Sequence, residues 1–426
     1  MPKHAWIGYK QRVYDSPSGE LRPGGGDARP LRVAFVHPVL GLGGAERLVV
    51  DAALELRERG HAVTIFTAEH DAARAFPETC DGRVDVQVRG RFLPAGLGGR
   101  LQAPCAIARL CWLAGTLAAG GDRFDVIVSD IAPYALPLLR ATRAFDRRAR
   151  RPRLVYYCHY PDQLLAPARA GWYRAYRAPL DRLEGPAMRA ADLVLANSHF
   201  TARAVAALGV ETPAVLYPGV NLEDCARIAD QRGDETAFLV VSRFDPRKNQ
   251  RLAVEAFARL RETAPAVFAR TSLILAGGLD RSRREDRDTA AAVTTRVRDL
   301  ALDGKVTLRP SPSEAERLAL LARSLCVVHP APDEHFGIVP VEAMAAGRPL
   351  VAVAHAGPLE SVVDGVSGLL REPTPDAFAH AMSAIAEDAA LRERLGREGR
   401  ARAARFSRRA FGDGLERALR DLVGRG

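Results

Sequence analysis

The sequence has 426 residues, 47% of them hydrophobic and 26% charged, which is the balance of a globular protein too long for one ordinary core. We therefore expect two domains of about 150–200 residues each. The net charge of +10 indicates an anionic partner, but an aromatic content of 6% and the absence of base-stacking motifs argue against nucleic acid.

Targeting signals and cysteine usage narrow the class further. No uncharged apolar run reaches the length of a membrane-spanning helix, and no apolar stretch follows Lys3 and Lys10 as in a signal peptide. The six cysteines are scattered without a C-x-x-C pair, so we expect reduced thiols, a cytoplasmic location and no structural zinc.

Residues 1–30 are rich in glycine and proline and show no apolar period, which predicts a flexible lead-in. A strand over 31–37 then runs into a glycine-rich turn with Gly43, Gly44 and Glu46, followed by a helix to about Arg59. Backbone N–H groups in such a turn can approach a pyrophosphate. The pattern is G-x-G-G-A-E and lacks a ribose-binding acid after the next strand, which disfavours a dinucleotide-binding dehydrogenase. A plain tight turn remains an alternative.

Strand-like runs at 62–67, 84–88, 125–129, 153–158, 193–197 and 214–217 alternate with helical segments, as in a doubly wound, mainly parallel sheet. Ligands of such sheets bind beyond the carboxyl ends of the strands. His159 stands at such an end, between Cys158 and Tyr160. A purely structural histidine is the alternative.

Two helical segments, at about 100–119 and 172–183, combine arginine, aromatic and apolar side chains. Arg100 and Arg109 accompany the first segment and several arginines the second. Such segments can lie in a membrane interface with arginines on lipid head groups, or they can be core helices. The sequence leaves both interpretations open.

The second domain begins near Phe238, where a buried strand ends at Ser242 and Arg243 and Lys248 flank the turn into a helix. Two cations beside a helix start predict a diphosphate site, although solvated surface charges are the alternative. Lys248 is one of only four lysines in the chain, which suggests that its compact charge matters.

Residues 333–347 follow another buried strand and contain two carboxylates eight positions apart. Glu334 is expected in the strand-to-helix loop and Glu342 about two turns into the helix, where carboxylates can bind the vicinal hydroxyls of a sugar. Alternatively, Glu334 caps the helix and Glu342 pairs with an arginine. An Asp286-Arg287-Asp288 sequence lies among arginines and is interpreted as solvated surface charge rather than a metal site.

In combination, G-G-A-E, Y-C-H-Y-P-D, S-R-F-x-x-R-K-N, E-H-F-G-I-V-P-x-E-A-M and G-P-L-E-S resemble family 4 of the retaining GT-B glycosyltransferases over about residues 31–423. Within that family, the loop around His159 is similar to that of the dolichol-pathway mannosyltransferases. The resemblance implies an α/β fold of GT-B type, with two Rossmann-like doubly wound domains facing across a cleft. The expected divisions are a lead-in at 1–30, an acceptor-side domain at 31–217, a nucleotide-sugar domain at 218–405 and a helix at 406–426 that returns to the first domain.

The implied activity is transfer of mannose from GDP-mannose to a lipid-diphosphate-linked oligosaccharide, in α-1,3 linkage and with α-1,6 transfer left open. No metal or cofactor is implied, and the expected partners are the nucleotide sugar, the lipid-linked glycan and an anionic membrane surface to which the enzyme attaches peripherally on the cytoplasmic face. The departing diphosphate can itself take the acceptor proton. Two alternatives remain: a family 4 enzyme with another donor in exopolysaccharide or glycolipid synthesis, and a non-catalytic nucleotide-sugar or membrane-binding protein.

The resemblance also assigns residues. Arg243 and Lys248 would neutralise the diphosphate, Glu334 would hold sugar hydroxyls, Glu342 the ribose, and His159 would face the donor sugar. The implied catalytic set is His159, Arg243, Lys248 and Glu334; the donor-binding set is Gly43, Gly44, Arg243, Lys248, Glu334, Phe336, Gly337, Ile338, Val339 and Glu342; the acceptor-side set is Glu46, Tyr160 and Asp162.

Overall fold

The computed structural model describes residues 13–14, 29–94, 96, 102–120, 123–145, 151–165, 171–229 and 236–425. The chain forms two compact units, Met1–Gly219 with Arg408–Gly426 (unit 1) and Val220–Ser407 (unit 2). The predicted divisions at 217/218 and 405/406 lie two residues before these two crossings. Apart from residues 13–14 and 29–30, the expected lead-in lies outside the described residues.

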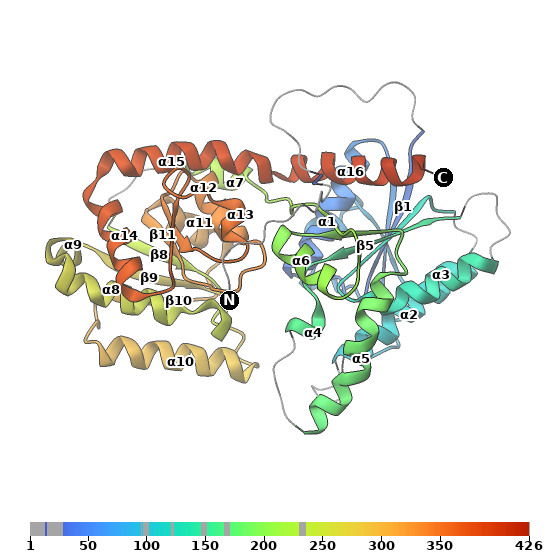
Figure 1. Cartoon of the computed structure of the whole chain (residues 1–426), viewed down its shortest axis with the longest axis horizontal. Helices are drawn as coiled ribbons and strands as arrows, with labels where there is room; N and C mark the ends of the chain where they lie inside the picture. Colours follow the sequence, from blue (N-terminus) through green and yellow to red (C-terminus); the bar gives the residue numbers. More distant parts are fainter. Residues whose placement is uncertain are drawn as a thin grey trace. The chain divides into compact units, whose positions relative to one another are not determined.

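Unit 1 is built on a seven-stranded parallel sheet (Figure 1) of order β3-β2-β1-β4-β5-β6-β7. The strands are β1 (Arg32–His37), β2 (Ala62–Thr67), β3 (Asp85–Val88), β4 (Val126–Asp130), β5 (Arg153–Cys158), β6 (Leu193–Ala196) and β7 (Ala214–Val215). The order reverses between β1 and β4. Their carboxyl ends therefore define the switch point where ligands of doubly wound sheets bind.

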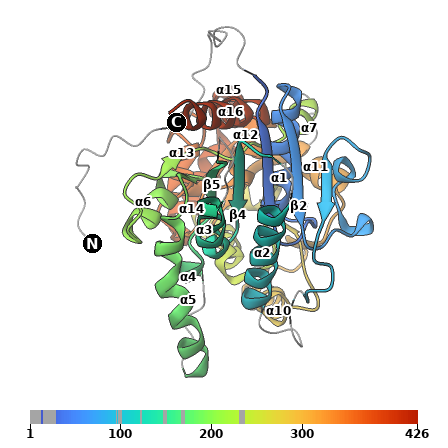
Figure 2. The ribbon, with the colours of Figure 1, turned by 90° about the vertical axis from the view of Figure 1, so that its right-hand side faces the viewer.

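Helices cover both faces of this sheet. They are α1 (Gly44–Glu58), α2 (Gln102–Ala119), α3 (Leu136–Phe145), α4 (Asp162–Leu165), α5 (Trp172–Met188), α6 (His199–Ala207) and α16 (Arg408–Gly424). Because side chains alternate along a strand, Val33 and Phe35 of β1 pack in the core with α1 and α16, whereas Ala34 and Val36 pack with α2. Figure 2 shows α5 projecting beyond the sheet of unit 1.

The last helix, α16, is part of unit 1 and lies on α1 (Figure 1). Arg59 at the end of α1 pairs with Asp413 at 2.5 Å, and His61 pairs with Glu416 at 3.1 Å. Gly412 permits the close approach, since a Cβ there would lie 2.6 Å from a carboxylate oxygen of Glu55. The helix is thus held by ion pairs as well as by its apolar face.

Unit 2 contains a six-stranded parallel sheet of order β10-β9-β8-β11-β12-β13. The strands are β8 (Ala237–Val241), β9 (Ser272–Gly277), β10 (Val306–Pro310), β11 (Ser324–His329), β12 (Leu350–Val353) and β13 (Leu369–Arg371). The helices are α7 (Glu223–Arg227), α8 (Gln250–Thr263), α9 (Pro265–Arg270), α10 (Arg284–Asp299), α11 (Glu314–Ala322), α12 (Ile338–Ala345), α13 (Pro358–Ser361), α14 (Pro375–Glu387) and α15 (Ala389–Ala403). β8 and β11 are the central neighbours, and α8 and α14 pack over one face of the sheet. The predicted fold class is confirmed.

The two segments with uncertain roles are helices α2 and α5. α2 buries Leu110, Leu113 and Leu117 in the core, and its Arg109 is buried against the carbonyl of Leu93 and the carboxylate of Glu69. Arg109 is therefore not available for a lipid head group, while Arg100 lies outside the described residues. In the described part of the chain, no helix has the length and apolarity needed to span a bilayer.

Candidate functional site

In unit 1, three polar side chains meet at the carboxyl ends of neighbouring strands. His37 ends β1, Asp130 ends β4, and His159 follows β5. Oδ1 of Asp130 lies 2.8 Å from Nδ1 of His37, and Oδ2 lies 3.3 Å from Nε2 of His159. One carboxylate thus bridges two imidazoles at the switch point of the sheet.

Asp130 and His37 each stabilise the charged form of the other. Burial alone would raise the pKa of Asp130, but the two histidines hold it at about 2, so the group is a carboxylate. Burial opposes protonation of His37, yet the attraction of Asp130, aided by Glu46, raises the pKa of His37 above its usual value. A carboxylate only accepts hydrogen bonds, so both facing ring nitrogens carry protons.

The glycine-rich turn begins α1 directly after this cluster. Gly43 is the residue before the helix and has an extended backbone, and Gly44 opens the helix. The carboxylate of Glu46 folds back over Gly43 and occupies the space where a side chain on Gly43 would lie. A larger residue at position 43 would displace the flexible carboxylate of Glu46 from this place.

The loop after His159 is fixed to unit 1 by several contacts. The side-chain amide of Asn197 donates to the carbonyl of His159 at 2.7 Å, and the ring of Tyr160 stacks on Phe200. The half-exposed carboxylate of Asp162 pairs with Arg177 at 2.5 Å. Asp162 therefore has a structural partner, which leaves only part of its carboxylate accessible to an acceptor.

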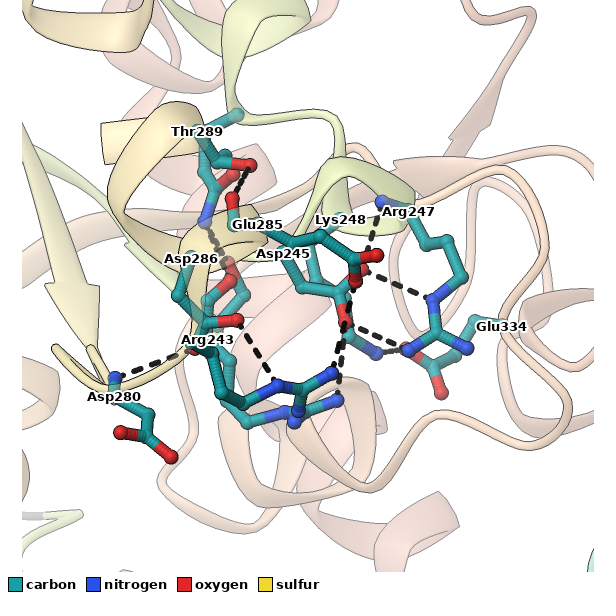
Figure 3. Close-up of polar contacts among 12 residues, drawn as sticks. Arg243, Asp245, Arg247, Lys248, Asp280, Glu285, Asp286, Thr289 and Glu334 are labelled. Carbon is teal, nitrogen blue, oxygen red and sulfur yellow. Dashed lines mark hydrogen bonds and ion pairs between the residues drawn. The ribbon is translucent and has the colours of Figure 1, made fainter. Parts of the chain in front are cut away.

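In unit 2, the predicted diphosphate residues surround a turn after β8 (Figure 3). Asp245 is buried and accepts from Arg247 at 2.7 Å and from Arg243 at 3.2 Å. Burial would raise the pKa of Asp245, but Arg247 and Arg243 lower it to about 2. The guanidinium of Arg243 is half exposed, so Asp245 orients it while N–H groups remain for an anion.

Lys248 contacts one of the two predicted carboxylates directly. Its Nζ donates to Oε2 of Glu334 at 2.5 Å (Figure 3). Burial by itself would raise the pKa of Glu334, but the charge of Lys248 holds it below its usual value. His329 is buried 3.7 Å from Glu334, and burial lowers its own pKa to about 4, so it is neutral. The lysine–glutamate pair joins the end of β8 to the loop after β11.

Glu342 lies in α12 and forms an ion pair with an arginine, which was one of the two alternatives that the sequence left open. Its Oε2 accepts from Arg317 at 2.8 Å, and Arg317 also binds Glu314 at 2.6 Å. Burial raises the pKa of Glu342, although Arg317 opposes that effect. The second carboxylate oxygen has no bond to Arg317, so the pairing is compatible with a hydroxyl ligand.

The segment between the two glutamates forms the loop and first turn of α12. Phe336 is buried, Ile338 is exposed, and Val339 is half buried. Gly337 precedes the helix with φ of 90°, a conformation that favours glycine. The N–H of Gly357 donates to the carbonyl of Glu334 at 2.8 Å, and a side chain on Gly357 would collide with the backbone of Phe336. The G-P-L-E turn therefore holds the Glu334 loop in place.

The predicted residues fall into two groups, one in each unit. His159, Tyr160, Asp162, Gly43, Gly44 and Glu46 belong to unit 1, and Arg243, Lys248, Glu334, Phe336, Gly337, Ile338, Val339 and Glu342 belong to unit 2. Sequence reasoning missed four contacting residues, His37, Asp130, His329 and Arg317. Three of them end strands, which is the signal that could have found them.

The interpretation of the Asp286-Arg287-Asp288 sequence needs one correction. Asp288 is exposed, but Asp286 is buried and accepts from the N–H of Asp280 at 3.3 Å, near the start of α10 (Figure 3). It is a structural residue of the helix start rather than solvated charge. Within the described ranges, no group of three or more histidine, cysteine or acidic residues could hold a metal ion.

Comparison with known proteins adds information about ancestry. Residues 42–224 match the family model Glycosyltransferase Family 4, and residues 225–402 match the model Glycosyl transferases group 1. Alpha-1,3/1,6-mannosyltransferase ALG2 of Mus musculus is 38% identical over 92% of this chain and 96% of its own. The Homo sapiens protein of the same name is 37% identical over the same shares, and that of Dictyostelium discoideum is 31% identical over 93% and 99%.

Solved structures with this fold are more distant in sequence. Sucrose-phosphate synthase of Thermosynechococcus elongatus has a TM-score of 0.72 at 21% identity, covering 93% of this chain and 100% of its own. HepE of Anabaena, in complex with UDP, has a TM-score of 0.68 at 21% identity, covering 92% and 100%. These likenesses concern the fold alone.

Proposed function

The chain belongs to the alpha-1,3/1,6-mannosyltransferase family within glycosyltransferase family 4, and from this premise we propose the reaction that it catalyses. It transfers mannose from GDP-mannose to a lipid-diphosphate-linked oligosaccharide, forming an α-1,3 linkage, adding α-1,6 mannose and retaining the anomeric configuration. The observation that carries this proposal is the contact of Lys248 with Glu334 beside Arg243 in unit 2. Two cations suited to a diphosphate beside a carboxylate suited to hexose hydroxyls support this proposal.

The cations act on the charge that grows as the sugar–phosphate bond breaks. An ammonium group has three donors, so Lys248 can keep its bond to Glu334 and still donate to a phosphate oxygen. Arg243 is oriented by buried Asp245 and supplies a second cation. Preorganised charges of this kind are typically the largest single contribution to catalysis. The diphosphate takes the acceptor proton, and no metal is needed for charge neutralisation.

The carboxylates hold the donor. Glu334 accepts from hydroxyls of the mannose, and Glu342 accepts from the ribose through the oxygen that Arg317 does not bind. In unit 1, His159 contacts the donor sugar, and Glu46, Tyr160 and the accessible part of Asp162 serve the acceptor side. The amides of Gly43 and Gly44 and those at the start of α12 contribute N–H donors.

We propose that unit 1 also attaches to an anionic membrane on the cytoplasmic face, where its lipid-linked acceptor lies. Helix α5 projects from the sheet (Figure 2) and exposes Arg174, Arg182 and Leu183. Trp112 of α2 stacks edge-on with Phe92, and the two rings are 44% and 69% exposed. Exposed arginine and aromatic side chains are suited to a lipid interface. All six cysteines are free thiols, in accord with a reducing compartment.

A donor screen with purified protein tests the reaction. Labelled GDP-mannose, UDP-glucose and UDP-N-acetylglucosamine are each incubated with a synthetic mannosyl-chitobiosyl-diphosphate lipid, and Lys248→Met serves as the inactive control. We expect transfer from GDP-mannose alone, with products cleaved by linkage-specific α-mannosidases. Transfer from a UDP-sugar instead would establish the exopolysaccharide or glycolipid alternative. Binding of all donors without turnover would indicate a non-catalytic protein.

A further inference from the structure

The bridging carboxylate of unit 1 has no role in the reaction described so far. We propose that Asp130 is a positioning residue that fixes the tautomer and orientation of His159, with His37 as the countercharge that makes this possible. The inference rests on the proposed function for its catalytic consequence, but its structural part can be tested independently.

The geometry gives Asp130 two distinct tasks. Its Oδ1 is 2.8 Å from His37, which is completely buried, and its Oδ2 is 3.3 Å from His159, which is partly exposed. A carboxylate accepts only, so Nε2 of His159 must carry a proton and point into the protein. Nδ1 is then the ring nitrogen left for a substrate hydroxyl.

His37 balances the charge of this buried carboxylate. Asp130 is 2% exposed, and an uncompensated carboxylate there would carry a large desolvation cost. The imidazole of His37 faces it from β1 through Nδ1, and the backbone of Val39 also favours the protonated ring. Asp130 has the largest favourable influence on the charge of His37. Because His37 balances the charge of Asp130, this carboxylate can orient the ring of His159 while Nε2 of His159 keeps its proton.

The backbone next to Asp130 points to the same role. Ile131 has φ of 63°, a left-handed conformation in which a β-branched residue is strained. The N–H of Ala132 turns back to the carbonyl of Asp130 at 2.7 Å. This strained turn ends β4 abruptly and leaves the Asp130 side chain between the two histidines. Backbone strain of this kind is typical of functional sites.

His159 is confined on its other sides. The ring of Tyr157 packs edge-on against it with centroids 5.2 Å apart, and Asn197 holds its carbonyl. Among the described residues, Asp130 alone forms a hydrogen bond with a ring nitrogen of His159. Removing the carboxylate should thus free the tautomer while leaving the loop in place.

The test compares Asp130→Asn with Asp51→Asn in the full-length protein. Asp51 is a matched control because it is an equally buried carboxylate of unit 1, paired with Arg47 in α1. Nitrogen-15 chemical shifts of the histidine rings report the tautomer, and His159→Gln assigns the signals. We expect the Nε2–H form of His159 in the wild type and in Asp51→Asn, and loss of that preference in Asp130→Asn.

Kinetics provide the second readout. Asp130→Asn should lower kcat for mannosyl transfer by roughly 10–100-fold, the scale for losing a partner that orients a histidine, with the donor KM within about threefold. Asp130→Glu should restore part of kcat. An Nδ1–H tautomer in the wild type, or an unchanged tautomer and kcat in Asp130→Asn relative to Asp51→Asn, would overturn the inference. If Asp130→Asn does not fold, the wild-type tautomer still decides. If the wild type transfers no mannose, the proposed function fails while the tautomer measurement stands.

Discussion

Replacing Lys248 by methionine should separate the catalytic role of the ammonium from its role in stability. Methionine keeps the unbranched apolar part of the side chain but removes the ammonium group that contacts Glu334 at 2.5 Å. We expect kcat to fall by roughly 10²–10³-fold, the scale for losing one preorganised electrostatic contact. The substitution also leaves Glu334 without its cation.

The stability cost follows from how exposed the pair is. Lys248 is 24% exposed and Glu334 is 19% exposed, so the pair lies between a surface and a buried ion pair. Surface pairs contribute about 0.2–1 kcal/mol, whereas breaking a buried pair costs about 3–5 kcal/mol. His329 is neutral and cannot replace the lost charge. We therefore expect the free energy of unfolding of Lys248→Met to fall by about 1–3 kcal/mol.

The double variant Lys248→Met/Glu334→Gln makes the test decisive. It removes both charges, so urea unfolding should show recovery of most of the lost stability, while kcat should stay at least as low as in the single variant. Steady-state kinetics with GDP-mannose and urea titrations at one pH measure the two quantities. Turnover by Lys248→Met within threefold of wild type would refute the assignment of Lys248 to the leaving diphosphate. A double variant as unstable as Lys248→Met would refute the ion-pair estimate.

Four further outcomes are expected. Mannosyl transfer should survive excess EDTA, and its loss with recovery on adding manganese would contradict the metal-free mechanism. Glu342→Ala should raise the donor KM while kcat changes within a fewfold, the signature of uniform binding; a fall in kcat alone would move Glu342 to the reacting sugar. Burial lowers the pKa of His61, which faces Glu416, Arg420 and Arg59. The neutral ring therefore stabilises the fold above about pH 6.5, and this stabilisation is lost as the pH falls through the lowered pKa. In urea unfolding between pH 5 and 7, the free energy of unfolding of His61→Gln should depend less on pH than that of the wild type, and an equal pH dependence would refute this. In a flotation assay, the protein should bind vesicles that contain anionic lipid at low salt only. The variant Arg174→Glu/Arg182→Glu should lose more vesicle binding than the variant of an exposed arginine in α10, Arg298→Glu. Equal loss of binding in the two variants would place the membrane contact elsewhere.

The fold was predictable because its signals are local. The runs at 153–158 and 325–329 are apolar apart from Arg153 and His329 at their ends, as expected of strands buried on both faces. The strand predicted at 214–217 is shorter in the structure, where only Ala214 and Val215 pair with β6. Strand ends depend on pairing with neighbours, which a pattern along one segment does not contain.

The candidate site was only partly predictable. Glu334 and Lys248 stand in patterns that carry chemistry by themselves, but their mutual contact joins residues 86 positions apart. Asp130 and His37 are 93 positions apart and gain meaning only when β1 and β4 become neighbours. Strand order is a property of the whole sheet. The position of Asp130 at the end of an apolar run marks the carboxyl edge of the sheet, but its histidine partners depend on the strand order.

The return of the chain to unit 1 has a consequence for biosynthesis. Phe411, Leu415, Ala418 and Leu419 of α16 belong to the same core as β1 and α1. A ribosome delivers β1 first and α16 only after all of unit 2 has been made. Domains commonly fold as units in the order of their synthesis, but unit 1 must wait with an open apolar face until residues 408–424 emerge. Unit 2, Val220–Ser407, is continuous and can complete its core earlier. The nascent protein should therefore mature from its second unit, and shortening α16 should expose the first to chaperones and proteases.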